Sequence, residues 1–282
     1  AQLVLILGIV LAVSLTGLLL TANDFANDFW LRTLLWVLLI TAYTAFWFSL
    51  AVLINSFGFS SAANAVVSSA VWLVLVLILP SLLNVAVSAI YPVPARNEAI
   101  AAIRNVNLDM RKDGSRVLSE HYQDHPELMP KNEKPDLNDF GLAFVYVQRE
   151  QKKRVEEVEN RFAEQLGKQQ DLVRNLRFLS PSIITNEALN DIAGTGLERY
   201  SHFRGQVKEF DKAWADYFVP KIFRLEKLSA GDFEQIPRFN FQEEKFVNVF
   251  SRVIFGVLFL FVASAVLIYL AFGKLKNYKL EN

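Results

Sequence analysis

The sequence predicts an all-α membrane protein with four transmembrane helices and a mainly helical domain outside the cytoplasm. Hydrophobic residues make up 52% of the 282 residues, which is high for a soluble chain of this size, yet 21% of the residues are charged. The charges are segregated, because residues 1–23, 33–95 and 253–273 carry none. The alternation of period two that is typical of strands never lasts more than a few residues, so helices are expected throughout.

Four apolar stretches are long enough to cross a bilayer, which takes about 20 helical residues. They are residues 1–22, 33–54, 62–83 and 250–273. The apolar region 33–90 would be about 87 Å long as one helix at 1.5 Å per residue, so it must turn. Because the chain starts at Ala1 inside an apolar segment, without the basic start of a signal peptide, we expect it to be the C-terminal part of a longer protein.

The turn between the second and third spans is expected where small and weakly polar residues interrupt the apolar region. These residues carry no charge and include a glycine, which favours a tight turn. The turn residues singled out are Asn55, Ser56, Gly58, Ser60 and Ser61.

The orientation follows from the lysines after the last span, because positive residues in short loops favour the cytoplasmic side. The tail 274–282, KLKNYKLEN, carries three lysines and is expected to be cytoplasmic. Counting back, the turn is then cytoplasmic and the large insert 91–249 is external. The inverted topology, with a cytoplasmic insert, stays open as an alternative because the turn itself has no basic residue.

The insert is expected to be mainly helical because its apolar residues recur every three or four positions. Its helical segments are expected at 95–123, 137–179, 181–194 and 197–226. The proline-rich stretch 125–136 and the segment 227–239 are expected to be loops.

Two parts of the insert carry more specific expectations. Residues 148–154, QREQKKR, interrupt the apolar stripe of the long helix, so we expect them to form a solvated neck. Phe239, Phe246 and Phe250 share one side of the segment before the last span. This pattern predicts either an interfacial helix or simply the first turns of the span.

Few residues point to chemistry. His121 and His125 are four positions apart and could both face a metal ion from one side of a helix. The pair also lies beside Pro126, where a helix is ending, and histidines are favoured there by the helix dipole alone. We expect no metal site and keep the two histidines as weak candidates.

Enzymatic activity is not expected in this chain. No Gly-x4-Gly-Lys-Ser/Thr pattern for binding ATP phosphates occurs. Ser180 and Ser182 could join a hydrolase triad only on paper, since no nucleophile signature surrounds them. Apart from Arg252 near the start of the last span, the predicted spans contain no Asp, Glu, Lys or Arg, so an ion-coupled carrier would lack its usual groups. The absence of cysteine means that the insert must be held by packing without disulfides.

A resemblance to a known family rests on residues 46–84, FWFSLAVLINSFGFSSAANAVVSSAVWLVLVLILPSLLN. Here an apolar helix passes through the small polar turn into an Ala/Ser-rich helix that ends near Pro80. In this respect the chain resembles the permease subunits of ABC-2 type transporters. The large helical insert before the last span resembles a subgroup of these permeases that includes gliding-motility-type transporters.

The resemblance implies the permease subunit of an ATP-driven ABC exporter, which moves substrate or relays ATP-driven motion to its extracytoplasmic domain. The spans would be the last four of six, in the inner membrane, with a periplasmic insert and a cytoplasmic C-terminus. The implied partners are an ABC ATP-binding subunit that holds ATP and Mg²⁺, a second permease chain, identical or paralogous, and membrane lipid, but no nucleic acid. The alternative is a non-transporting membrane receptor or scaffold whose external domain binds a partner.

Overall fold

The computed structural model describes residues 8, 12, 16–17, 28–124, 126, 137–224 and 226–276. Throughout this part of the chain the regular elements are helices and no strand occurs, which confirms the all-α prediction. All but four residues of the expected first span at 1–22, nearly all of the expected loop at 125–136 and the tail after Lys276 lie outside the described residues.

The helices follow one another with short connections. They are α2 Phe29–Asn55, α3 Ser61–Leu73, the π-helix η1 Val74–Ile78, α4 Leu79–Ile90, α5 Arg96–Asp124, α6 Leu137–Leu176, the 3-10 turn η3 Arg177–Leu179, α7 Pro181–Ala193, α8 Leu197–Phe223, α9 Ala230–Gln235 and α10 Phe246–Lys276.

In the part of the chain that the structure describes, three helices are long and apolar enough to cross a membrane. They are α2, the continuous helix Ser61–Ile90 formed by α3, η1 and α4, and α10, with 27, 30 and 31 residues respectively. At 1.5 Å per residue each is about 40 Å or longer, more than the roughly 30 Å of the hydrocarbon core. Three of the expected spans are therefore helices, and each extends beyond the expected bounds.

The chain divides into two compact units. The membrane unit comprises the described residues of 1–83, 176–202 and 242–282, and the insert unit comprises those of 84–175 and 203–241. The expected insert 91–249 contributes residues to both units. Its central segment and its last residues fold with the candidate spans.

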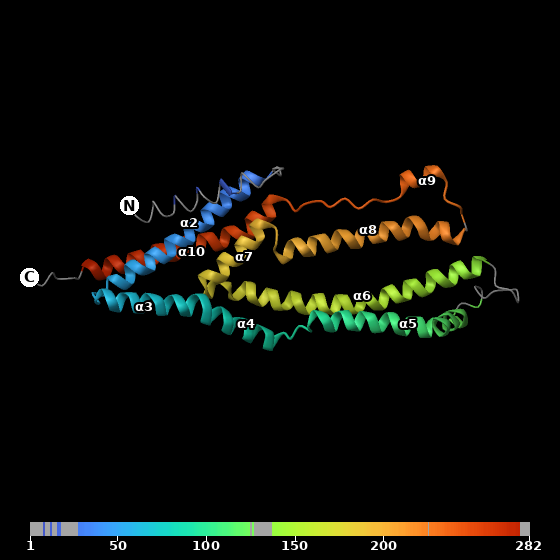
Figure 1. Ribbon diagram of the computed structural model, residues 1–282, viewed down its shortest axis with the longest axis horizontal. Helices are drawn as coiled ribbons and strands as arrows, with labels where there is room; N and C mark the ends of the chain where they lie inside the picture. Colours follow the sequence, from blue (N-terminus) through green and yellow to red (C-terminus); the bar gives the residue numbers. More distant parts are fainter. Residues whose placement is uncertain are drawn as a thin grey trace, which may run out of the picture. The chain divides into compact units, whose positions relative to one another are not determined.

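In the membrane unit, α2 and α10 lie side by side (Figure 1). Their shared core is apolar, and Leu39 of α2 and Leu260 of α10 are fully buried. Large apolar side chains such as Leu34 of α2 and Phe255 of α10 remain exposed on the outside of these helices. A helix that is apolar on both its packed and its outward faces is typical of a membrane span.

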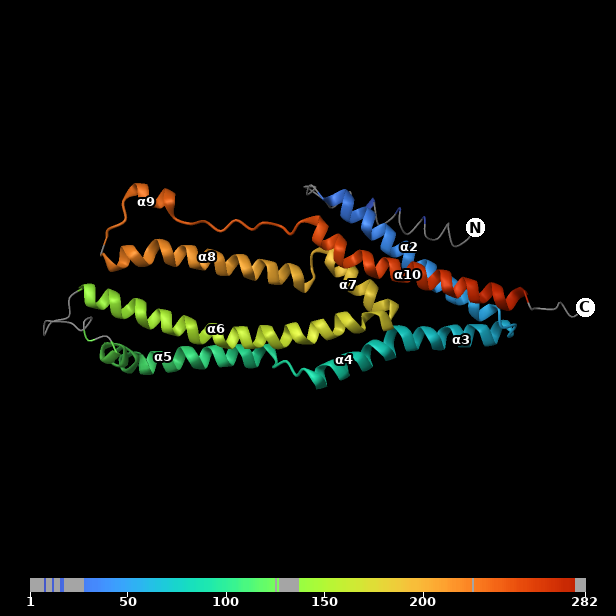
Figure 2. The same ribbon diagram turned by 180° about the vertical axis from the view of Figure 1, so that it is seen from behind.

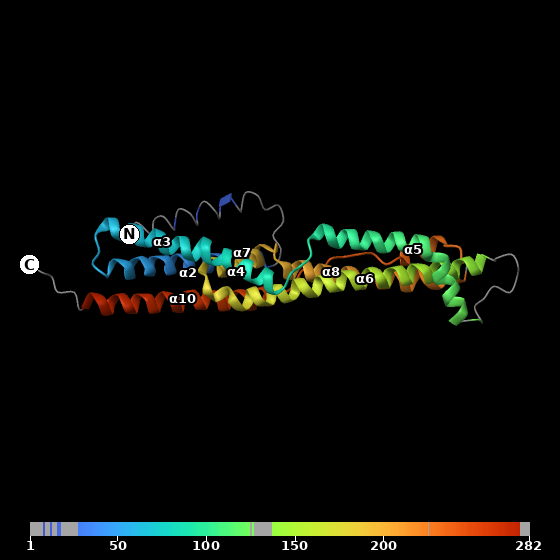
Figure 3. The same cartoon turned by 90° about the horizontal axis from the view of Figure 1, so that it is seen from below.

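The turn between α2 and α3 occupies residues 56–60, at the break in the apolar pattern. Figure 3 shows α3 beside α2 beyond this turn. Gly58 has φ 74°, a left-handed conformation that glycine adopts without strain. Ser60 is the N-cap of α3, and its side chain accepts a hydrogen bond from the Ala63 N–H at 3.3 Å. The small polar residues thus close one helix and open the next.

The insert unit is built mainly from α5, α6 and α8 (Figure 2). Residues 148–154 are helical within α6, and polar side chains link them to both neighbours. Gln151 donates to Asn107 of α5 at 2.7 Å, and Lys152 forms an ion pair with Asp211 of α8. None of residues 148–154 is buried and Lys152 is 44% exposed, so the stretch is solvated as predicted, but it also has polar partners on α5 and α8 in place of the missing apolar stripe.

The segment 227–239 also differs from its prediction as a loop, because it contains α9. A capping box starts this short helix: the Ser229 N–H and hydroxyl both donate to the Asp232 carboxylate at 2.7 Å. Residues 237–245 are not helical, and α10 begins at Phe246. A separate helix before the span is therefore not formed, and Phe246 and Phe250 belong to the helix that continues as the candidate span α10.

Candidate functional site: a short helix among the candidate spans

The main unexpected feature of the membrane unit is α7, which packs against both α2 and α10. Its residues Ile184, Ala188 and Ile192 lie one turn apart on one face and are all buried. They join the apolar core that α2 and α10 form. A segment with charged neighbours in the sequence therefore lies among the candidate spans.

The closest approach of α7 to α10 occurs at Gly256. A Cβ atom at this position would lie 2.6 Å from Cγ2 of Ile184, closer than side chains can approach. Ile184 is 2% exposed, so it has little room to move away. The absence of a side chain at Gly256 is thus what allows α7 to sit on α10 at this distance.

Arg252 holds the C-terminal end of α7 to α10. Its two terminal nitrogens donate to the Glu244 carboxylate at 2.6 and 2.8 Å, and its Nε donates to Asp191 of α7 at 3.3 Å. The bidentate arrangement with Glu244 is the strong form of this interaction. One guanidinium thus neutralises two carboxylates that come from different segments.

Arg32 holds the same end of α7 to α2. Its Nη1 donates to the carbonyl of Ile192 at 3.1 Å, and its Nε pairs with Asp28 at 2.7 Å. The last carbonyls of a helix lack internal donors and carry partial negative charge. After them Gly194, at φ 69°, ends α7 in the left-handed conformation, as the glycine there predicts.

The N-terminal end of α7 contacts the candidate span Ser61–Ile90. The Ser180 hydroxyl is buried and donates to the carbonyl of Leu75 at 2.7 Å. The Ser182 hydroxyl lies 2.8 Å from that of Ser180. Both serines therefore hold helices together, and this position does not favour the hydrolase role considered for them.

The segment before α7 brings an ion pair to the candidate spans. Arg177 lies 3.4 Å from Glu187, and the neighbouring Phe178 ring packs on Phe259 at 5.0 Å. Phe259 is seven residues after Arg252, or about 10 Å along a helix. The expectation of no charge among the spans is therefore incomplete, because α7 and its flank carry charges into this region. Ionisable groups at such positions are candidate functional groups.

The carboxylates around Arg252 and Arg199 have shifted pKa values. The hydrogen bond from Arg252 lowers the pKa of Glu244, although burial opposes this effect. The hydrogen bond from Arg199 likewise lowers the pKa of Glu243. Burial raises the pKa of Asp191, and the more distant interaction with Arg252 offsets this only in part.

These directions predict that acid destabilises the membrane unit. A carboxylate whose pKa is lower in the folded state stabilises the fold above its unfolded pKa, and this stability is lost as the pH falls through the folded pKa. The pKa of Asp191 is raised in the folded state, so its protonation favours the fold and offsets part of this loss. For Glu244 we expect the melting temperature to fall as the pH drops below 4.5, the ordinary pKa of a glutamate, and through the lowered pKa of the folded state.

Melting curves of the wild type and Glu244→Gln from pH 7 to pH 3 measure this effect. The variant should melt lower at pH 7 and show a flatter pH dependence. Glu234→Gln, on an exposed side chain, is the matched control and should follow the wild type. Parallel curves for wild type and Glu244→Gln would contradict the assignment.

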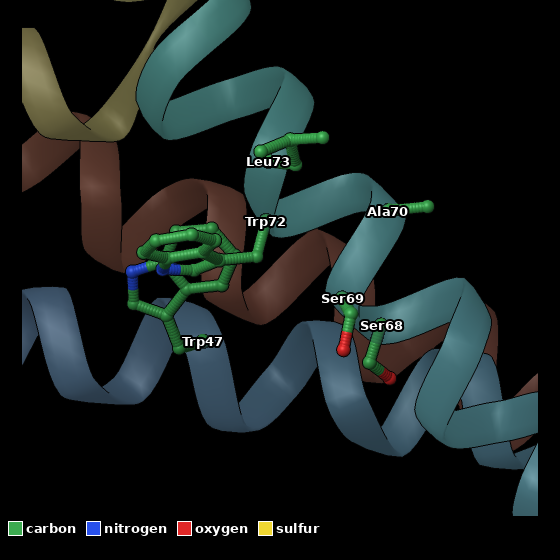
Figure 4. Close-up of a pocket in the computed structure, with 6 residues that line it drawn as sticks. All are labelled: Trp47, Ser68, Ser69, Ala70, Trp72 and Leu73. Carbon is green, nitrogen blue, oxygen red and sulfur yellow. The ribbon is translucent and has the colours of Figure 1, made fainter.

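A groove of about 750 Å³ lies between α2 and α3 (Figure 4). The residues that line it are Trp47, Ser68, Ser69, Ala70, Trp72 and Leu73. None of them is ionisable or a strong metal ligand, so the groove offers no acid–base group. Its lining is mainly apolar, apart from the hydroxyls of Ser68 and Ser69.

Comparison with known proteins gives one finding. The family described as "Domain of unknown function (DUF3526)" matches residues 96–242, just over half of the chain. The chain belongs to the DUF3526 family. No curated protein and no solved structure matches it significantly.

The DUF3526 region runs from the first residue of α5 almost to the start of α10, so it includes α7. The family region thus covers both most of the insert unit and the segment that packs among the candidate spans. The sequence held a signal for this packing, because Ile184, Ala188 and Ile192 recur every four residues. The separate arginines near the starts of two spans, Arg32 and Arg252, were the second signal.

The predicted histidine pair of this DUF3526 protein is not placed by the structure. His121 belongs to α5, but its side chain is outside the described part, as is all of His125. Among the described residues no group of three His, Cys, Asp or Glu side chains could hold a metal ion. The pair therefore stays a prediction.

The predicted turn residues cluster at the end of the membrane unit where α10 also ends. The Phe57 and Phe59 rings stack at 6.0 Å, and Lys274 Nζ lies 5.3 Å from the centre of the Phe57 ring. The Ser56 hydroxyl donates to the carbonyl of Leu53 at 2.7 Å. The turn without a lysine of its own therefore has one beside it, supplied by α10. Asn55 ends α2 and Ser61 begins α3.

Proposed function

We propose that this DUF3526 protein is the permease subunit of an ATP-driven ABC exporter of the ABC-2 type. ATP and Mg²⁺ would bind to a separate ATP-binding subunit, and a second permease chain would complete the membrane part. The protein would cross the inner membrane four times within this sequence, with the insert unit in the periplasm. Substrate export, or motion relayed to the insert unit, would follow from ATP-driven movement of the spans.

The observation that carries this proposal is the packing of α7 on α2 and α10. An exporter that works on an external domain needs a connection by which span movement reaches that domain. In this chain a helix within the DUF3526 region is held to two candidate spans by Arg32, Arg252 and an apolar core. A domain that is tied to the bilayer only through its ends would not need these contacts.

The ATPase assay tests the proposal directly. The purified chain alone should not hydrolyse ATP, whereas its complex with a co-encoded ATP-binding subunit should hydrolyse ATP steadily. A partner with its Walker A lysine replaced is the control and should be inactive in the same complex. Steady turnover by the pure chain, or failure of every co-encoded ATP-binding protein to form a complex, would contradict the proposal.

The orientation has its own test, supported by the position of Lys274 beside the turn. Both lie at the end of α10 opposite to Arg252, and lysine favours the cytoplasmic side. The native chain has no cysteine. A membrane-impermeant maleimide added to intact cells should therefore label Lys227→Cys in the insert but not Asn277→Cys in the tail. Labelling of the second variant alone would establish the inverted topology.

A receptor or scaffold is the second candidate, and one observation favours it. The insert unit exposes several large aromatic side chains, among them Trp214 at 45% and Phe233 at 57%. Exposed aromatic residues are common where a protein partner binds. A stable complex between the insert unit and an external protein, without any associated ATP-binding subunit, would favour this candidate.

A further inference from the structure

The candidate span Ser61–Ile90 contains a backbone carbonyl that lacks a donor in its own helix. In η1 the Leu79 N–H donates to the carbonyl of Val74, five residues back, and not to that of Leu75. The next residue, Pro80, has no N–H to offer. The carbonyl of Leu75 is therefore left open by the combination of the π-helical segment and the proline.

Ser180 supplies the missing donor from another segment. Its hydroxyl donates to the Leu75 carbonyl at 2.7 Å, and Ser180 is 0% exposed. Because that hydroxyl has a single proton, the 2.8 Å contact with Ser182 is a hydrogen bond donated by Ser182, whose hydroxyl also lies 3.4 Å from the Leu75 carbonyl. The two serines form a short chain of hydrogen bonds that ends on the span. An unpaired carbonyl among apolar side chains would be unfavourable.

Ser180 makes this bond in place of a local one. It is the N-cap residue of α7, and a serine there usually accepts a hydrogen bond from an N–H of the first helical turn. The Ser180 side chain makes no such bond. Its hydroxyl therefore serves the contact between helices and not the stability of its own helix.

The two ends of α7 hold different spans. The C-terminal end is bonded to α2 through Arg32 and to α10 through Arg252. The N-terminal end is hydrogen-bonded to the span Ser61–Ile90 at η1. A π-helical segment is a frequent site of functional rearrangement within a longer helix.

We propose that the hydrogen bond from Ser180 to the Leu75 carbonyl, supported by Ser182, is a latch that holds a hinge at η1 in the span Ser61–Ile90. With the latch closed, the Leu75 carbonyl is paired and α3 is fixed relative to α2 and α10. With it open, the carbonyl needs another donor, so η1 must rearrange and α3 moves. This device belongs to the fold of the chain and does not depend on the proposed export activity.

The test uses the full chain in lipid nanodiscs and a Ser180→Ala, Ser182→Ala double variant. Spin labels on Val66→Cys of α3 and Val262→Cys of α10, both on exposed positions, report the distance between these helices. The double variant should broaden the measured distance distribution. It should also lower the melting temperature by about 5 °C, as expected for one unpaired buried group.

Pro80→Ala provides the decisive background, because the new N–H can pair within the helix and close the gap at Leu75. In this background the serine substitutions should broaden the distribution, and lower the melting temperature, less than half as much. Ser81→Ala, an exposed serine next to Pro80, is the control and should change neither measurement. An unchanged distribution in the double variant, or an equal effect with and without Pro80, would overturn the latch.

Discussion

Arg252→Ala is expected to lower the free energy of unfolding by about 3 kcal/mol, the largest effect of any single substitution considered for this protein. The substitution leaves two carboxylates without their shared partner. The side chains of Glu244 and Asp191 are only 12% and 16% exposed, so water cannot replace the guanidinium fully. Chemical or thermal unfolding of the purified chain in nanodiscs measures the change.

Arg224→Ala is the matched control for this prediction. Arg224 also pairs with a carboxylate, Glu226, but its side chain is 72% exposed. An exposed ion pair contributes about 0–1 kcal/mol, so this variant should stay close to the wild type. Adding Glu244→Gln to Arg252→Ala should recover part of the loss, because one uncompensated charge is removed. Equal effects of the two arginine substitutions would show that burial of the cluster does not matter.

Gly256→Ala is expected to destabilise the membrane unit by about 2 kcal/mol through overpacking. The added Cβ would meet Cγ2 of Ile184 at 2.6 Å, and that side chain is buried. The effect must exceed the gain of about 1 kcal/mol that alanine brings to a helix interior in place of glycine. The melting temperature of the variant measures the net result.

Gly273→Ala in the same helix separates these two contributions. A Cβ at Gly273 would meet nothing within 4 Å, so this variant should be neutral or slightly more stable. In an Ile184→Ala background the clashing methyl is absent, and Gly256→Ala should no longer destabilise. If it destabilises equally in both backgrounds, the close approach of α7 to α10 is not its cause.

Local chemistry explains why several elements could be predicted from the sequence. Long uncharged stretches predict the helices of the candidate spans, since their periodicity and length depend on neighbouring residues only. Pro181 and Gly194 bound α7 as predicted, because proline favours a first helical turn and glycine a left-handed end. Short-range turn chemistry likewise places the break at residues 56–60.

Two features of the insert differ from what the sequence predicts, and their causes differ. The polar stretch 148–154 is solvated as expected, but it also has partners on α5 and α8. The segment around α9 was expected to be a loop, although Ser229 and Asp232 were present to cap a short helix. The partners of 148–154 lie far along the chain, so no local pattern reveals them, whereas the capping pair of α9 is local and present in the sequence.

The sequence by itself thus determined the helical class, the apolar helices and the bounds of α7. Only the tertiary structure decided that α7 packs with the candidate spans and not with the rest of the insert. The physical reason is that its polar ends are satisfied by distant groups: Arg32 lies 160 residues from Ile192, and Arg252 lies 61 residues from Asp191. A charged segment can leave water only where such partners are already in place, and sequence spacing does not show where they will be.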